Sequence, residues 1–387
     1  MSGWAPNVRR GAALPFVLAA LVVGGVCATS VALVAREAGR ATLGGAAATQ
    51  AVASAEGALA GVLARWPARW NVALDPGAPA ERDVVTPAGR ARVRVVRLDA
   101  MRFAVEAESR SAPAAGPVDG PAVRRRSLLV RLRHVALAPV AAVTAGGQVR
   151  LAAGATVSAA DQVPDGWTDC PPSGGGVPAG GAFGAAAAPD VQPDPGAVID
   201  GPVRTDAAAW AAALDPRFGD DGYGAHAGRA HVVVDGAGPW SPVPAAGEPV
   251  VPGDVGAEPC ALTSSSWGEP ARGGGVVQEC AGALPVVRLR GAVVRLRGPA
   301  RFQGTMLVDG DLVVEGKVRG AGVVVVRGAV DAGAGALVLD GALVAGGAVR
   351  LGAGSRVRAS SCAADRAALY GARAVPLARR AWAEVVR

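Results

Sequence analysis

Residues 9–36 read RRGAALPFVLAALVVGGVCATSVALVAR, and this stretch decides the fold. Between the arginine pair and Arg36 it carries no charged side chain. About 20 apolar residues are enough to cross a bilayer as a helix, because a helix pairs its backbone groups within one segment. No proline follows Pro15 before Pro67. We therefore expect a cytoplasmic leader at 1–11 and one long helix over 12–66, whose first half is transmembrane.

Arg9 and Arg10 set the expected orientation of this helix. Basic residues beside a membrane span are retained on the cytoplasmic side. The chain is therefore expected to cross the inner membrane once, with its N-terminus in the cytoplasm and its C-terminal part in the periplasm or at the cell surface. A cleaved secretory signal is the alternative. The apolar run is longer than a usual signal core, and Val26-Cys27-Ala28 is a poor cleavage site.

Residues 67–138 contain stretches in which apolar and charged side chains alternate, as in a sheet with one solvent-exposed face. Apolar and charged side chains alternate over 91–97 (ARVRVVR), over 101–108 (MRFAVEAE) and again over 122–133. A period of two predicts strands, and the short step at Asp99-Ala100 predicts a hairpin between the first two. We expect a small antiparallel sheet that packs its apolar face on the outer half of the long helix, since neither surface can stay exposed.

Glycine recurs at every sixth residue near the end of the chain, at 298, 304, 310, 316, 322 and 328, and then at 335, 341 and 347. The second and fourth positions between glycines are mostly apolar, which predicts short strands with glycine corners, the unit of a parallel β-solenoid. Residues 148–158 resemble 348–359. We therefore expect an α+β protein with a β-solenoid at 139–160 and 284–360, a loop-rich insertion at 161–283 and a helical C-terminal cap at 361–387.

The cysteines favour disulfides in an exported segment. Cys27 lies in the apolar run, whereas an even set of four, Cys170, Cys260, Cys280 and Cys362, lies beyond it. An even count outside the cytoplasm favours two disulfides. The pairing does not follow from sequence. Cys260 with Cys280 is the first choice because they bracket a short loop, which leaves Cys170 with Cys362.

The composition and motifs favour a structural role. The net charge of +7 comes with only 4% aromatic residues, so we expect no nucleic-acid partner, because such surfaces combine clustered cations with stacking aromatics. No nucleophile elbow, phosphate loop or metal-binding spacing is present, and we expect no catalytic residue, metal or cofactor. An enzyme that cleaves polysaccharide on a β-helix, or an adhesive module, remains the alternative.

The N-terminal segment resembles type IV pilin-like proteins, in particular minor pilins of the PilX kind. The resemblance lies in Arg9-Arg10-Gly11 before the apolar run and in residues 50–59 (QAVASAEGAL), and it covers about 60 residues. It implies that a prepilin peptidase cuts after Gly11, that Ala12 becomes the new N-terminus, and that other pilin subunits and the lipid bilayer are partners. Phe16 stands where major pilins carry a glutamate. The glycine-rich end is similar in style to bactofilin solenoids.

Overall fold

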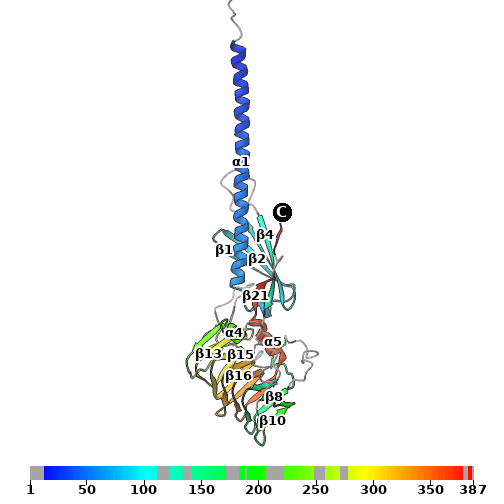
Figure 1. The fold of residues 1–387 in the computed structure, drawn as a ribbon, viewed down its shortest axis with the longest axis vertical. Coiled ribbons are helices and arrows are strands. Elements are labelled where there is room, and N and C mark those ends of the chain that lie inside the picture. Colours follow the sequence, from blue (N-terminus) through cyan, green and yellow to red (C-terminus); the bar gives the residue numbers. More distant parts are fainter. Residues whose placement is uncertain are drawn as a thin grey trace, which may run out of the picture.

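The computed structural model describes residues 13–110, 123–133, 141–168, 170, 183–187, 190–205, 222–247, 258–270, 278–377 and 382–385. It shows a long apolar helix, a small antiparallel sheet and a large parallel sheet that is nearly closed on itself (Figure 1). The α+β class expected from the sequence fits this architecture.

The long helix is α1, Ala13–Ala64. Alanine, leucine and arginine favour it, and the paired glycines at 24–25 and 44–45 do not interrupt it. It ends shortly before Pro67, because the residue before a proline is disfavoured in helical conformation. A single turn, α2 (Trp70–Ala73), follows.

The antiparallel sheet contains the three predicted strands and three more. Its order is β1-β2-β3-β4-β21, and β22 also pairs with β4. The strands are β1 (Pro79–Thr86), β2 (Gly89–Arg97), β3 (Arg102–Arg110), β4 (Val123–Arg133), β21 (Arg373–Pro376) and β22 (Trp382–Val385).

The expectation of a helical cap over 361–387 is therefore wrong in part. Among the described residues of this range only α5, Ser361–Tyr370, is helical, and the chain then returns to the small sheet, where Arg373 pairs with Arg133. The physical reason is that β4 would otherwise leave its backbone groups unpaired along one edge. That pairing outweighs a weak helical pattern, since tertiary contacts override local propensity.

The second half of α1 covers one face of this sheet. Ala55, Ala58, Leu59 and Val62 repeat at helical spacing and are fully buried against sheet residues such as Phe103. The opposite face carries rows of alternating charge, such as Asp83, Arg92, Glu108 and Arg125 on four adjacent strands. The sheet thus has one buried face and one solvent-exposed face, as the alternation of side chains predicted.

Within the described residues the parallel sheet contains sixteen strands. They are β5 (Ala141–Ala145), β6 (Val149–Leu151), β7 (Thr156–Ser158), β8 (Phe183–Ala187), β9 (Val191–Pro193), β10 (Val198–Asp200), β11 (Val203–Arg204), β12 (Val232–Asp235), β13 (Val286–Arg290), β14 (Val293–Arg297), β15 (Ala300–Val308), β16 (Asp311–Val326), β17 (Val330–Ala332), β18 (Gly335–Ala345), β19 (Val349–Leu351) and β20 (Arg356–Ala359). A short helix α4 (Gly222–Ala227) and a turn η2 (Gln278–Cys280) lie between them in sequence.

The glycine repeat marks the corners of this sheet. Gly304 pairs with Gly322, and Gly322 pairs with Gly341, so the three stack in register. Each has a positive φ, of 92°, 125° and 146° respectively, a conformation that glycine adopts without steric cost. Inward side chains stack in the same way, with Met306 beside Val324, and form one large buried core.

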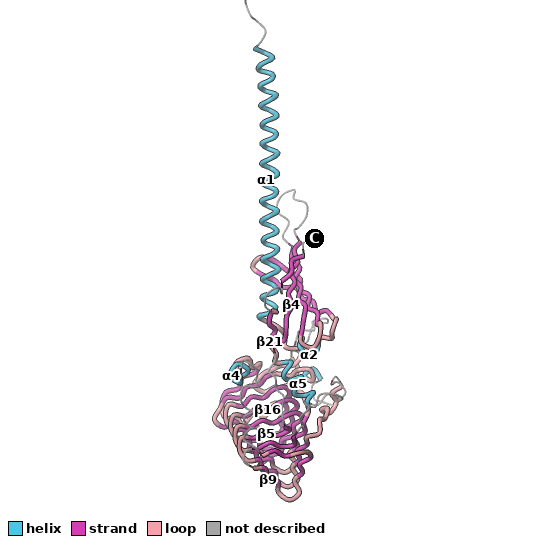
Figure 2. Tube along the Cα trace, turned by 45° about the vertical axis from the view of Figure 1, so that its right-hand side comes forward, coloured by secondary structure: helices cyan, strands magenta, loops and turns pink. Residues whose placement is uncertain are grey.

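The order of the strands differs from the expected order. The segment with β5 to β7 was expected to precede β13, but it lies beside the last part of the chain, where Val149 pairs with Val349. The two similar sequences at 148–158 and 348–359 are therefore direct neighbours. Figure 2 shows β5 below β16 and β9 at the far end.

Part of the expected insertion is also ordered strand. Residues 161–283 supply β8, β9, β10 and β11 at one end of the parallel sheet and β12 at the other. The strand β12 pairs with β13, where Val232 lies opposite Val287. The parallel sheet as a whole is inserted between β4 and β21 of the small sheet.

Candidate functional site

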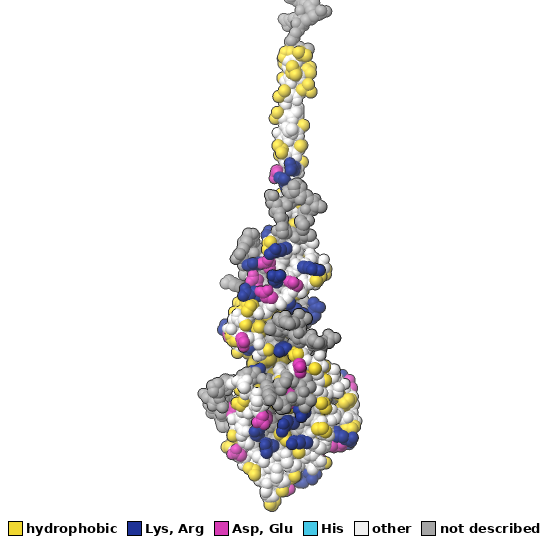
Figure 3. All heavy atoms as spheres, turned by 180° about the vertical axis from the view of Figure 1, so that it is seen from behind, with side chains coloured by type: hydrophobic (Ala, Val, Ile, Leu, Met, Phe, Trp, Pro, Cys, Tyr) yellow, Lys and Arg dark blue, Asp and Glu magenta, His cyan; other side chains and the backbone are white. Residues whose placement is uncertain are grey.

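The first half of α1 is the most prominent candidate site, because it is apolar and unpartnered. Every residue from 14 to 39 is exposed, and the segment is long and apolar enough to cross a membrane. Thr29 and Ser30 do not break this character, since each hydroxyl donates to a carbonyl one turn earlier, at 2.7 and 2.8 Å. Figure 3 shows hydrophobic side chains along this part and the first charged ones below it.

Those first charges form a pair. Arg40 Nη1 lies 3.0 Å from Glu37 Oε1 on the exposed helix. Charged groups cluster where a helix leaves a membrane, because burying them in hydrocarbon is costly. An N-terminal helix whose apolar first half is followed by charged residues has the arrangement of a membrane anchor.

The second half of α1 is fixed to the small sheet by polar contacts as well as by packing. Glu56 lies 3.3 Å from Arg126 of β4. Gln50 donates to the carbonyl of Ala88, and the Ser54 hydroxyl lies 3.2 Å from that of Thr86. One helix thus joins a free apolar half directly to a folded head.

The predicted cleavage residues Gly11 and Ala12 lie outside the described residues. Phe16, at the position noted for the departure from major pilins, is an exposed side chain in the first turns of α1. Its ring therefore faces outward with the rest of the apolar surface.

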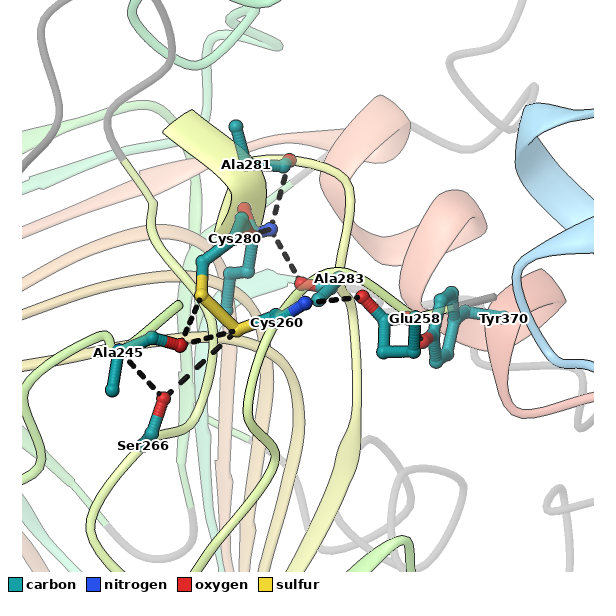
Figure 4. Close-up of a disulfide and its surroundings, with 9 residues drawn as sticks. Ala245, Glu258, Cys260, Ser266, Cys280, Ala281, Ala283 and Tyr370 are labelled. Carbon is teal, nitrogen blue, oxygen red and sulfur yellow. Dashed lines mark hydrogen bonds between the residues drawn. A yellow bond between two sulfur atoms is a disulfide. The ribbon is translucent and has the colours of Figure 1, made fainter. Parts of the chain in front are cut away.

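Both expected disulfides are present. Cys260 pairs with Cys280, closing a short loop (Figure 4), and Cys170 pairs with Cys362 at the start of α5. Cys27 is free and exposed on the apolar half of α1. Removing a native disulfide commonly costs about 2–5 kcal/mol, so these two bonds fix irregular segments that have little core of their own.

A buried polar contact joins the first disulfide to the junction between the sheets. The Tyr370 hydroxyl donates to Glu258 Oε2, while the Cys260 amide donates to Oε1 of the same carboxylate at 3.3 Å. Burial raises the pKa of Glu258, although the bond from Tyr370 partly offsets this effect. Burial also raises the pKa of Tyr370.

Asn71 holds the same junction from the helix side. Its amide nitrogen donates to the carbonyls of Leu369 and Ala372 at 2.9 and 3.1 Å, and its oxygen accepts from the Trp66 indole at 2.8 Å. Sequence reasoning singled out neither Asn71 nor Glu258. No motif marks them, because their partners are far away in the chain.

The histidines serve the fold. His226 is fully buried, and burial lowers its pKa to about 4. His231 Nδ1 accepts from the Val286 amide at 3.0 Å. His134, Asp220 and Asp221 lie outside the described residues. Within the described ranges no three His, Cys, Asp or Glu side chains are placed to hold a metal ion.

Comparison with known proteins adds little to this description. No family model matches the chain, and no curated protein matches its sequence. Among solved structures, the chain is similar to the competence-associated pilin ComZ from Thermus thermophilus, with 12% identity over 88% of this chain and 98% of that one. The TM-score is 0.26, which is too low to support an argument about this chain.

Proposed function

We propose that this chain is a membrane-anchored, pilin-like structural subunit. In this proposal the first half of α1 lies in the inner membrane with the N-terminus in the cytoplasm, and both sheets lie outside, in the periplasm or at the cell surface. The observation that carries the proposal is the division of α1. One continuous helix exposes an apolar first half and buries its second half on an antiparallel sheet.

The finer form of the proposal is a minor pilin or pilus-assembly component of the PilX kind. A prepilin peptidase would cut after Gly11, and the helix would then hold the subunit in the bilayer until it joins other pilin subunits. The arginine pair before the apolar run and the sequence at 50–59 support this form.

We further propose that the parallel sheet is a β-solenoid carried by the pilin-like head. Ala300 pairs with Val318 and Gly316 pairs with Gly335, so neighbouring strands are offset by 18 or 19 residues, which is three of the six-residue glycine intervals. Regular stacking of this kind supports a repeat architecture. Its work would be assembly or presentation at the envelope, without a reaction.

The test is N-terminal mass spectrometry of the protein purified from the membrane fraction of cells that contain a prepilin peptidase. The proposal predicts a chain that begins at Ala12, and a Gly11→Leu variant that keeps its full leader. A Gly3→Leu variant is the matched control and should begin at Ala12 like the wild type. A chain beginning at Met1 would indicate a plain anchor, and one beginning near Thr29 would indicate a secreted protein; either contradicts the proposal.

A further inference from the structure

A groove with a cavity volume of about 520 Å³ lies between the end of α1 and the strand β1. Its helix side is formed by Gly61, Val62 and Arg65, and its strand side by residues 82–85. Figure 1 shows the two elements next to each other on one side of the small sheet. Val62 also packs in the core shared with the sheet, whereas Gly61 and Arg65 take part in none of the contacts described above.

The groove is open because Gly61 on α1 has no side chain to fill the space above Arg82 on β1. On β1, Ala80, Arg82, Val84 and Thr86 share the face that turns towards α1, since strand side chains alternate. Ala80 is buried in the shared core, and Thr86 contacts Ser54 of the helix. Arg82 is the exception on this face and remains exposed.

Gly61 supplies the space. It has no side chain to cover β1, and a Cβ added there would meet nothing nearer than the Arg65 guanidinium, at 3.6 Å. The guanidinium of Arg65 therefore lies over Gly61, on the helix wall of the groove. Two cations thus line a space that an ordinary helix residue at position 61 would fill.

Neither cation has a counter-ion within the described part of the chain. Arg65 and Arg82 make no ion pair with the residues described, and the neighbouring carboxylate of Asp83 is 3.5 Å from Arg92 on the other face. A site with two uncompensated guanidinium groups attracts carboxylates or phosphates, which they bind through paired hydrogen bonds.

The strand beside the groove is also open. β1 is the end strand of its sheet and pairs only with β2 among the described strands. Among the described residues no strand pairs with the outer edge of β1, so its backbone N–H and C=O groups can accept a further strand. Such a strand would place every second side chain on the face that carries Arg82.

We propose that this groove and the open edge of β1 bind an extended acidic segment of another protein chain, added as a strand next to β1. Lipid phosphates are a poor alternative. Gly61 lies about 40 Å along the helix from Ala35, where the uncharged segment ends, so headgroups around that segment are out of reach. The proposal goes beyond the pilin-like assignment and does not require a filament.

The test uses the full chain in detergent micelles and a fluorescent octapeptide of alternating threonine and glutamate, with binding followed by anisotropy. Arg65→Glu and Arg82→Glu should each weaken binding on the order of tenfold or more, as expected for loss of a charge-assisted contact. Gly61→Leu should abolish binding by filling the groove, while its thermal midpoint stays at or above that of the wild type, because leucine favours helix more than glycine does.

Two controls make the result specific. Arg131→Glu changes the net charge equally, on an exposed position of β4, and should bind the peptide like the wild type. A threonine–glutamine octapeptide should bind at least tenfold more weakly than the acidic one. The proposal is overturned if Gly61→Leu binds normally, if both peptides bind equally, or if Arg131→Glu weakens binding as much as Arg82→Glu. It is also overturned if inorganic phosphate displaces the peptide at millimolar concentration, which would indicate a site for small anions.

Discussion

At the scale of single residues, Asn71 is the side chain that joins the helix and small sheet to the end of α5. It is fully buried, and its removal would take a hydrogen-bond partner from the Ala372 carbonyl and from the Trp66 indole, whereas the Leu369 carbonyl also accepts from the Ala372 amide. Leaving a buried polar group unpaired costs about 1–3 kcal/mol. Asn71→Ala should therefore lower the free energy of unfolding by about 3 kcal/mol, measured by urea denaturation of the full chain in detergent.

Gln50→Ala is the matched control for that measurement. It removes one exposed amide that donates to Ala88, and its effect should stay within about 0.5 kcal/mol. An Asn71→Ala variant as stable as Gln50→Ala would show that the junction does not depend on Asn71.

The partly buried carboxyl group of Glu258 should make the stability of the folded protein depend on pH. Burial raises its pKa in the folded protein above the unfolded value. Its contribution to stability is therefore complete at pH values below the unfolded pKa, near 4.3, and is lost as the pH rises through the folded pKa. Glu258→Gln removes this loss because the amide carries no charge. The variant should gain stability relative to the wild type between pH 4 and pH 7 in urea titrations; a constant difference over that range would contradict the assignment.

At the scale of elements, the corner glycines of the parallel sheet can be tested against each other. A Cβ at Gly322 would collide with the carbonyl of Gly304 on the neighbouring strand, whereas a Cβ at Gly354 would meet nothing nearer than 3.9 Å. Both have positive φ, which costs about 1–2 kcal/mol for another residue. In thermal unfolding, Gly354→Ala should lower the midpoint only by the amount that the backbone cost explains. Gly322→Ala should lower the midpoint clearly further, because the collision adds to that cost. Equal effects would show that stacking at the corner is loose.

The elements also show which parts of the structure a sequence can predict. The long apolar helix and the strands β2 to β4 depend on local patterns, and each appears where its pattern lies; the repeated glycines stack in register, while the solenoid itself stays a proposal. The strand β21 could not be predicted in this way, because its partner Arg133 is far earlier in the chain. The same applies to β8 to β11, which are two to five residues long and too short to show an alternation, and to the place of β6 beside β19. Gly11 and Ala12, the predicted cleavage site, stay predictions.

At the scale of the whole molecule, the parallel sheet is an insertion in the smaller one. Arg133 and Arg373 are paired neighbours on β4 and β21, so a two-residue turn could join them directly. A variant in which Asn-Gly replaces residues 134–372 should keep α1 and the small sheet folded, since Ala372 and, packed against it, Leu369 are the residues of the removed segment that the core of the small sheet contains among those described. Limited proteolysis in detergent should leave the shortened chain intact. Rapid digestion beyond α1 would show that the small sheet needs the large one.

For the molecule as a whole, the proposed arrangement requires lipid around the first half of α1 and an oxidising compartment around the two sheets. The most direct measurement is mass spectrometry of the protein from separated membrane and soluble fractions, alkylated under denaturing conditions without reductant. The account predicts a protein that stays in membranes after alkaline carbonate washing, with a single alkylated cysteine at Cys27 and four cysteines in disulfides. A protein recovered from the soluble fraction with all five cysteines alkylated would contradict it.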